Sequence, residues 1–529
     1  MVKQARIEEV KQPNILFLLS DEHGFRYMSH VSEEDGGEPV NTPNLDRLAD
    51  SGVRFTDAYC QMPLCTPSRL SMLTGLEVRR CGGWFNESVL RPELPTIPSV
   101  LNDAGYDSCL VGKMHLYGNN QFAGFNHRPY GDFTGKTGHQ WEPLSSKKTG
   151  PYAMRFRTSE AGVTEIPESL MQEHVVAEEG LSFVREHHHH NPNKPWFLCL
   201  SFSRPHFPLT APKRHFDRYW PNGVTKPYVP ATGDAYYHPM SLKMRQGFKA
   251  DQISDDEMMK ARAGYFACVD YLDEIIGDLL VRMETAGHLK DTVIIYTSDH
   301  GEMAGEHGVW WKHGWYEACT RVPLIISFPE QRYGSMPATV KRAPVGLVDL
   351  LPTICSIAGA SCPPNVDGID LSGSIFSGEE PADRPIFCDN LVPRWGEGTE
   401  FRMIRRNRYK YVHFRSAPPL MFDLKNDPKE LSNIYLNTPG YAEEAKRELI
   451  SIAEKSMDFE EAERERLVRD SALKELHHLV TLESTGNLYF MSSGKVVNAE
   501  DALCNPTVVI EDGFRDLTGR QSGGRSTAP

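Results

Sequence analysis

The sequence lacks long hydrophobic runs. None of its 529 residues belongs to an uninterrupted apolar stretch long enough to cross a bilayer. The first twelve residues are charged and contain no apolar core of the kind found in secretory leaders. These absences predict a protein that neither spans a membrane nor is exported, so we expect a cytoplasmic location.

An excess of positive charge is also missing. Lysine and arginine number 57 against 71 acidic residues, a net charge of −14, which argues against nucleic acid or anionic membranes as main partners. An anionic ligand would therefore need a local cationic pocket. The 11 cysteines are odd in number and show no paired spacing, which favours free thiols in a reducing compartment over a disulfide framework.

No repeat of fixed period occurs, and the length favours more than one domain. Apolar runs at 15–19, 108–111, 196–202, 293–297 and 324–328 predict buried strands. Helical patterns lie between or after them, at 43–51, 96–104, 167–185, 256–286 and 349–358. This alternation predicts an α/β domain with a large, mostly parallel mixed sheet sandwiched by helices.

The pattern changes after about residue 375. Short strands are expected at 402–406, 409–414 and 419–424, followed by one long charged helix at 441–470. We therefore predict an N-terminal extension at 1–12, a catalytic domain at 13–380, and a smaller α+β subdomain with an antiparallel sheet at 381–485. Residues 486–529 would form a C-terminal extension that could carry a homo-oligomer contact.

Residues 65–75 read Cys-Thr-Pro-Ser-Arg-Leu-Ser-Met-Leu-Thr-Gly. Thr66 and Pro67 suit a helix start, and Gly75 suits its end. Cys65 would then lie just before a helix N-terminus, where backbone N–H groups favour an anion, and Arg69 could reach back to it. By themselves these residues also fit a structural cysteine or a nucleophilic thiol.

Polar side chains follow four of the predicted strands. They are Asp21, Glu22 and His23; Lys113 and His115; Arg204 and His206; and Asp299 and His300. In open α/β sheets, ligands bind beyond the carboxyl ends of the strands, so we expect this set to meet at one edge beside Cys65. His115 or His206 alone would fit a buried structural role equally well.

The 65–75 run resembles the active-site signature of type I sulfatases, members of the alkaline phosphatase superfamily. In that family the cysteine of Cys-x-Pro-Ser-Arg is oxidised to formylglycine by a dedicated generating enzyme, which would be a partner here. The resemblance extends over about residues 13–435. It implies a metal site of Asp21, Glu22, Asp299, His300 and residue 65, and further catalytic residues Arg69, Lys113, His115, His206 and Lys312.

The same resemblance implies a mechanism. Hydrated formylglycine would supply the hydroxyl that attacks a sulfate monoester, while Arg69 and Lys113 neutralise developing charge. His206 or Lys312 would protonate the leaving alcohol, and His115 would take the proton that lets sulfate depart.

The expected metal is one divalent ion. Carboxylate oxygens suit Ca²⁺ or Mg²⁺, whereas the imidazole of His300 shifts the preference toward Mn²⁺. Ca²⁺ is favoured by the family, with Mn²⁺ or Mg²⁺ as alternatives. Glu22 and His300 depart from the commoner Asp and Asn of the family at these positions.

Two other functions stay open. One is a formylglycine-dependent hydrolase of phosphonate or phosphate esters, and the other is an inactive protein that binds sulfated glycans. The substrate is expected to be a small-molecule or oligosaccharide sulfate ester. A tryptophan set, Trp84, Trp310, Trp311 and Trp315, could line a sugar or cation subsite or simply pack. The histidine run 187–190 is expected to be a solvated loop.

Overall fold

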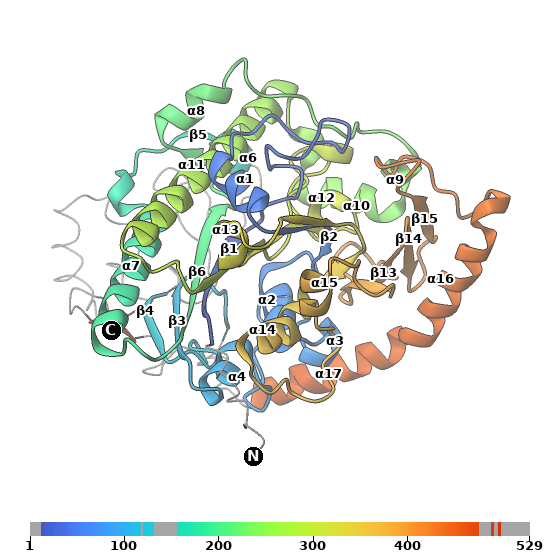
Figure 1. Cartoon of the computed structure of the whole chain (residues 1–529). Helices are drawn as coiled ribbons and strands as arrows, with labels where there is room; N and C mark the ends of the chain where they lie inside the picture. The colour runs from blue at the N-terminus through green and yellow to red at the C-terminus, as the bar shows by residue number, and fades with distance from the viewer. Residues whose placement is uncertain (1–11, 118–119, 132–155, 476–487, 491–495, 499–529) are drawn as a thin grey trace, which may run out of the picture.

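The computed structural model describes residues 12–117, 120–131, 156–475, 488–490 and 496–498 (Figure 1). Its centre is a nine-stranded sheet. The path along that sheet runs β10 (Thr339–Lys341), β2 (Val53–Tyr59), β9 (Arg321–Ser327), β8 (Thr292–Ser298), β1 (Asn14–Asp21), β6 (Trp196–Pro205), β3 (Asp107–Gly112) and β4 (His127–Tyr130), and β11 (Val345–Gly346) pairs with β2. Every pairing is parallel except those of β9 with β2 and β8. The predicted mixed, mostly parallel sheet is confirmed.

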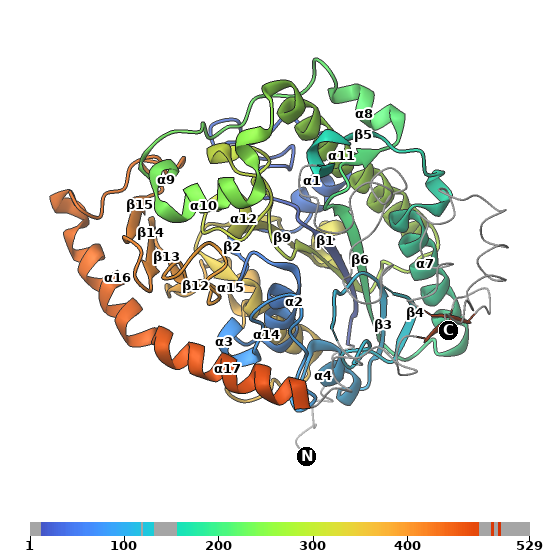
Figure 2. The ribbon, with the colours of Figure 1, turned by 180° about the vertical axis from the view of Figure 1, so that it is seen from behind.

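Helices cover both faces of this sheet because its central strands are apolar on both sides. In β1, Leu16 and Leu18 cluster with residues of α1 (Pro43–Asp50), α7 (Gln172–His190) and α11 (Asp255–Thr285). Ile15, Phe17 and Leu19 point the other way, since successive strand residues alternate, and join a core that includes α2 (Cys65–Thr74), α4 (Ile97–Asp103) and α14 (Leu350–Ala358). Figures 1 and 2 show these two layers from opposite sides.

A smaller antiparallel sheet follows in the chain. Its order is β12 (Ile386–Asn390), β13 (Phe401–Arg406), β14 (Tyr409–Phe414) and β15 (Leu420–Asp423). The single helix expected at 441–470 is wrong, because the structure has α16 (Glu443–Ser456) and α17 (Phe459–Glu475). Between them Asp458 accepts a hydrogen bond from the backbone N–H of Glu461 at 2.9 Å, the bond of a helix N-cap, so the chain restarts there.

The two helices pack against different parts of the molecule. α16 packs on the small sheet through Leu449 and Ala453, whereas α17 continues along the edge toward α3 (Val78–Cys81), where Glu465 pairs with Arg79 at 2.7 Å (Figure 2). The predicted extensions at 1–12 and 486–529 lie almost wholly outside the described residues, apart from Gln12 and strands β16 (Leu488–Phe490) and β17 (Val496–Asn498). The oligomer contact predicted there, and the division of the chain at residue 380, stay predictions.

The histidine run at 187–190 is not a loop, as the sequence suggested, but the last turn of α7. His187 is buried and its Nε2 lies 3.6 Å from the Asp107 carboxylate, while the other three histidines are exposed. His187 lies one helical turn after Val184 on the same buried face. The helix therefore continues through the histidine run and ends at the C-cap Asn191. Among the described residues, no helix combines the length and apolar character needed to cross a membrane.

A buried ion cluster ties the small sheet to the main domain, and it gives a first prediction. Lys410 on β14 donates to Glu317 at 3.0 Å and to Glu430 at 2.7 Å, and its side chain is fully buried. Lys410→Met removes the cation that Glu317 and Glu430 share and leaves Glu317 with the more distant Arg321 at 3.7 Å. Because a buried ion pair is broken, we expect the free energy of unfolding to fall by about 3–5 kcal/mol. Urea unfolding measures this.

The matched control is Arg406→Met on the neighbouring strand, whose ion pairs with Asp383 and Glu448 are far more exposed. It should cost about 1 kcal/mol or less. Equal effects of the two substitutions would contradict the importance assigned to the buried cluster.

Candidate active site

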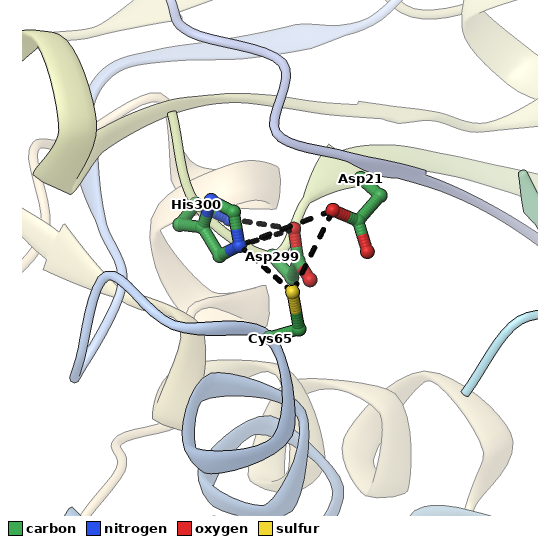
Figure 3. Close-up of side chains that lie close together, drawn as sticks. All are labelled: Asp21, Cys65, Asp299 and His300. Carbon is green, nitrogen blue, oxygen red and sulfur yellow. Dashed lines mark hydrogen bonds and ion pairs between the residues drawn. The ribbon is translucent and has the colours of Figure 1, made fainter. Parts of the chain in front are cut away.

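Four parallel strands that are neighbours in the sheet, β8, β1, β6 and β3, end at the same edge. Their ends deliver the polar residues expected from the sequence: Asp21, Glu22, Lys113, His115, His206, Asp299 and His300. All of these are buried, and the first turn of α2 brings Cys65 against them. The structure therefore places the residues from distant segments in one site, as Figure 3 shows for four of them.

Cys65 lies at the centre of this site. Its Sγ atom is 3.3 Å from His300 Nε2, 3.4 Å from Lys312 Nζ and 3.8 Å from Asp21 Oδ1. Asp21, Cys65, Asp299 and His300 each offer one ligand atom, and these atoms lie within 4.8 Å of one another. We call these four residues the metal-type cluster. Such a cluster of two carboxylates, an imidazole and the residue-65 side chain has the spacing of a metal site.

Arg69 orients Asp21 and Asp299 through hydrogen bonds. Its Nη2 donates to Asp21 Oδ2 and its Nε donates to Asp299 Oδ2, both at 2.8 Å. A third bond, from Nη1 to the Lys113 carbonyl oxygen at 2.6 Å, uses the remaining face of the guanidinium. With both Oδ2 atoms held, the Oδ1 atoms of the two aspartates turn toward Cys65 and His300 (Figure 3).

The helix that carries Cys65 begins two residues earlier than expected, since the sequence suggested Thr66 as its cap and Pro67 as its first residue. Cys65 is its first residue and Leu64 its N-cap, so Thr66 does not cap the helix. The Thr66 hydroxyl instead donates to the His115 carbonyl oxygen at 2.7 Å, which ties α2 to the turn after β3. Gly75 ends the helix with φ 66°, as its sequence position predicts.

Lysines balance the acids. Lys113 Nζ lies 2.8 Å from Asp21 Oδ2, and Lys312 Nζ lies 3.1 Å from Glu22 Oε2. Burial by itself would raise the pKa of Asp21, but Lys113, His206 and Arg69 hold it well below its usual range. Asp21 is therefore a carboxylate at neutral pH, as a metal ligand must be.

Glu22 lies beside the metal-type cluster and belongs to a second group with Asp21 and His206. His206 Nε2 is 3.4 Å from Glu22 Oε2, and burial raises the pKa of Glu22 to about 8 with a further contribution from Glu302. Glu22 also has a left-handed backbone with φ 67°, a strained state that often marks functional sites. The structure thus places Glu22 next to Lys312 and His206 and outside the metal-type cluster.

The donor set fits the divalent metal that the family implies. His300 Nδ1 lies 3.0 Å from the Gly301 carbonyl oxygen, which can only accept, so Nδ1 carries a proton and Nε2 is the nitrogen that faces the cluster and would bind a metal. Metal-bound histidines are commonly oriented in this way. Asp21, Asp299, His300 and residue 65 would hold the ion.

Sequence reasoning missed Glu302. It is buried behind Glu22, and its Oε1 accepts the backbone N–H groups of Ala304 and Trp311, each at 2.7 Å. Its position two residues after His300 was the available signal. Of the tryptophans, Trp84 packs against Leu391 and Met457, and Trp315 packs against Phe401 and Phe414, so these two have structural roles.

The chain matches the family described as Sulfatase over residues 13–360, and that of N-sulphoglucosamine sulphohydrolase, C-terminal, over residues 305–455. It is 30% identical over 447 residues to a choline-sulfatase of Rhizobium meliloti (strain 1021), covering 82% of this chain and 84% of the relative. An N-acetylglucosamine-6-O-sulfatase of Bacteroides thetaiotaomicron is 28% identical over 504 residues, 85% and 87% of the two chains.

Among solved structures, the phosphonate monoester hydrolase of Agrobacterium radiobacter superposes with a TM-score of 0.66 at 22% identity, covering 92% of this chain and 99% of that one. This likeness concerns the fold. The family match spans most of the chain and includes every strand end that builds the site. The chain therefore belongs to the sulfatase family.

Proposed function

We propose that the chain hydrolyses the sulfate monoester of a sugar or another small alcohol, with formylglycine formed from Cys65 as the nucleophile. The convergence of Cys65 with Asp21, Asp299 and His300 carries this proposal. A bound divalent ion would supply Lewis-acid activation of the hydroxyl on residue 65 and of the sulfate oxygens. Calcium is our preferred ion, because three of the four ligands would be oxygen atoms once residue 65 is oxidised.

The chain's own residues would then act in sequence. Arg69 keeps the Oδ1 atoms of Asp21 and Asp299 aimed at residue 65. Lys113, anchored at 2.8 Å from Asp21, adds positive charge where the sulfate oxygens become more negative. After the alcohol leaves, His115 takes a proton from the second hydroxyl of residue 65, so that sulfate departs and the aldehyde is restored.

The proton for the leaving alcohol would come from His206 or Lys312. His206 Nδ1 lies 2.8 Å from the Phe207 carbonyl oxygen and so carries a proton, which leaves Nε2 directed at the carboxylates of the site. Lys312 Nζ lies 3.4 Å from Cys65 Sγ. Replacing His206 and comparing substrates with good and poor leaving groups distinguishes these two candidate acids.

We expect His206→Ala to lower kcat/KM about 10²–10⁴-fold on an alkyl or sugar sulfate, the usual contribution of a general acid. On 4-nitrophenyl sulfate the loss should be much smaller, because the nitrophenolate needs little protonation. Steady-state kinetics on both esters is the measurement. Equal losses would show that His206 shapes the pocket, and Lys312 would become the candidate acid.

The overall proposal is tested by a screen of the protein coexpressed with a formylglycine-generating enzyme. Choline sulfate, sulfated sugars and aryl sulfates are compared with phenyl phosphonate esters under the same conditions. Sulfate release with kcat/KM above that for the phosphonates is expected, since the curated relatives reported above are sulfatases. Faster phosphonate turnover would favour the alternative hydrolase, and binding of sulfated sugars without turnover would favour an inactive binding protein.

A further inference from the structure

A cation is placed beside the candidate acids and is not used by the mechanism above. Arg157 lies on the short helix α6 (Phe156–Ser159). Its guanidinium carbon is 3.6 Å from the centroid of the Phe207 ring and 5.6 Å from that of Trp311. Phe207 follows His206 in the chain and Trp311 precedes Lys312. Arg157 therefore lies next to the two residues that would protonate the leaving alcohol.

Charged groups of the active site act on Arg157. Burial lowers its pKa to about 10, Glu22 and Cys65 act in the opposite direction, and Arg394 adds to the lowering. Arg394 comes from the loop after β12 and is exposed, with its guanidinium carbon 5.2 Å from the Trp395 ring centroid. The charge of Arg394 thus acts on Arg157, although the two arginines lie more than 200 residues apart in the chain.

This geometry bears on the alcohol part of the substrate. When the sulfate group lies at residue 65, the bridging oxygen must face His206 or Lys312, so the alcohol extends toward Arg157. A guanidinium binds carboxylate or sulfate with paired hydrogen bonds. A quaternary ammonium would need an open aromatic face, yet Arg157 already covers the face of Phe207 with a like charge.

We propose that Arg157, supported by Arg394, binds a second anionic group on the alcohol part of the substrate, so that the preferred ester is a doubly anionic sugar. This inference rests on the proposed sulfatase function. It names a specificity residue for that reaction, and it sets the substrate apart from choline sulfate, whose alcohol is a cation.

The test compares wild type with Arg157→Met, which keeps the bulk, and Arg157→Lys, which keeps the charge. Two substrate pairs differ in one anionic group: N-acetylglucosamine 6-sulfate against glucosamine-2-N,6-O-disulfate, and the methyl ester of a 2-sulfated uronoside against its free acid. We expect Arg157→Met to lower kcat/KM on the dianionic member of at least one pair by about 10–100-fold more than on its partner, a typical loss for a charged hydrogen bond. Arg157→Lys should recover part of it, and Arg394→Met should show a smaller loss of the same kind.

The pair that responds identifies the second group as sulfate or carboxylate. The matched control is Arg408→Met, an arginine whose guanidinium carbon also lies near an aromatic ring, 5.6 Å from the Tyr409 ring centroid, but in the turn between β13 and β14 of the small sheet. Equal losses of Arg157→Met on both members of both pairs would overturn the proposal and leave Arg157 a packing role. So would a wild-type preference for choline sulfate. If converted wild type released sulfate from none of these esters, the sulfatase function itself would fail, which is a separate outcome.

Discussion

Replacing Cys65 by alanine is expected to lower kcat/KM on sulfate esters by about 10⁴–10⁶-fold, as happens when a covalent nucleophile is removed. No neighbouring side chain can take its place, because the Sγ atom is the point where His300 Nε2, Lys312 Nζ and Asp21 Oδ1 converge. In active wild-type protein, mass spectrometry of the peptide that spans residue 65 should show an aldehyde in place of the thiol.

Cys81→Ala is the matched control. Cys81 is also buried and follows Cys65 by 16 residues, but its thiol donates only to the Val78 carbonyl oxygen at 3.5 Å. This variant should keep its kcat/KM. Full activity in protein whose residue 65 is an unmodified thiol would refute the formylglycine mechanism.

Asp299→Asn is expected to remove both metal binding and turnover, with a fall of kcat/KM of about 10²–10⁴-fold, because a bound metal contributes several kcal/mol of charge stabilisation in the transition state. The amide keeps the shape of the side chain but loses its charge, and its one oxygen cannot both accept from Arg69 Nε, which Asp299 Oδ2 does at 2.8 Å, and face the cluster around residue 65. Elemental analysis of the purified protein and steady-state kinetics are the two measurements.

A second buried Asp–Arg pair separates the site effect from a general loss of stability. Asp389 accepts from Arg402 Nε at 2.9 Å and from Arg402 Nη2 at 2.7 Å, away from the metal-type cluster. Asp389→Asn should lower the free energy of unfolding by an amount similar to Asp299→Asn, since both weaken a buried ion pair. It should leave metal content unchanged. Retained metal in Asp299→Asn would remove Asp299 from the proposed ligands.

Local pattern was sufficient for most of the fold. The five predicted strands of the main sheet are all present, because central strands of a parallel sheet must be apolar on both faces and so appear as continuous apolar runs. β2 (Val53–Tyr59) was missed, since three of its seven residues are only partly buried and it pairs antiparallel with β9 near the end of the sheet. The break in the C-terminal helix was missed because the charged pattern continues across Asp458.

The chemistry at residue 65 was readable from the sequence, since it depends on a contiguous run that starts a helix. The roles around it were decided by the tertiary structure. Arg69 could be placed near Cys65 from helical spacing, yet only folding brings Asp21 and Asp299 to its two nitrogens. Arg157 carried no signal in the sequence, because its position depends on Phe207 and Trp311, which reach it from other parts of the chain. The sequence thus determined the strands, the helix start and the residue types available for catalysis. The contacts between side chains that orient those residues join positions as far as 290 residues apart, and no local spacing encodes them.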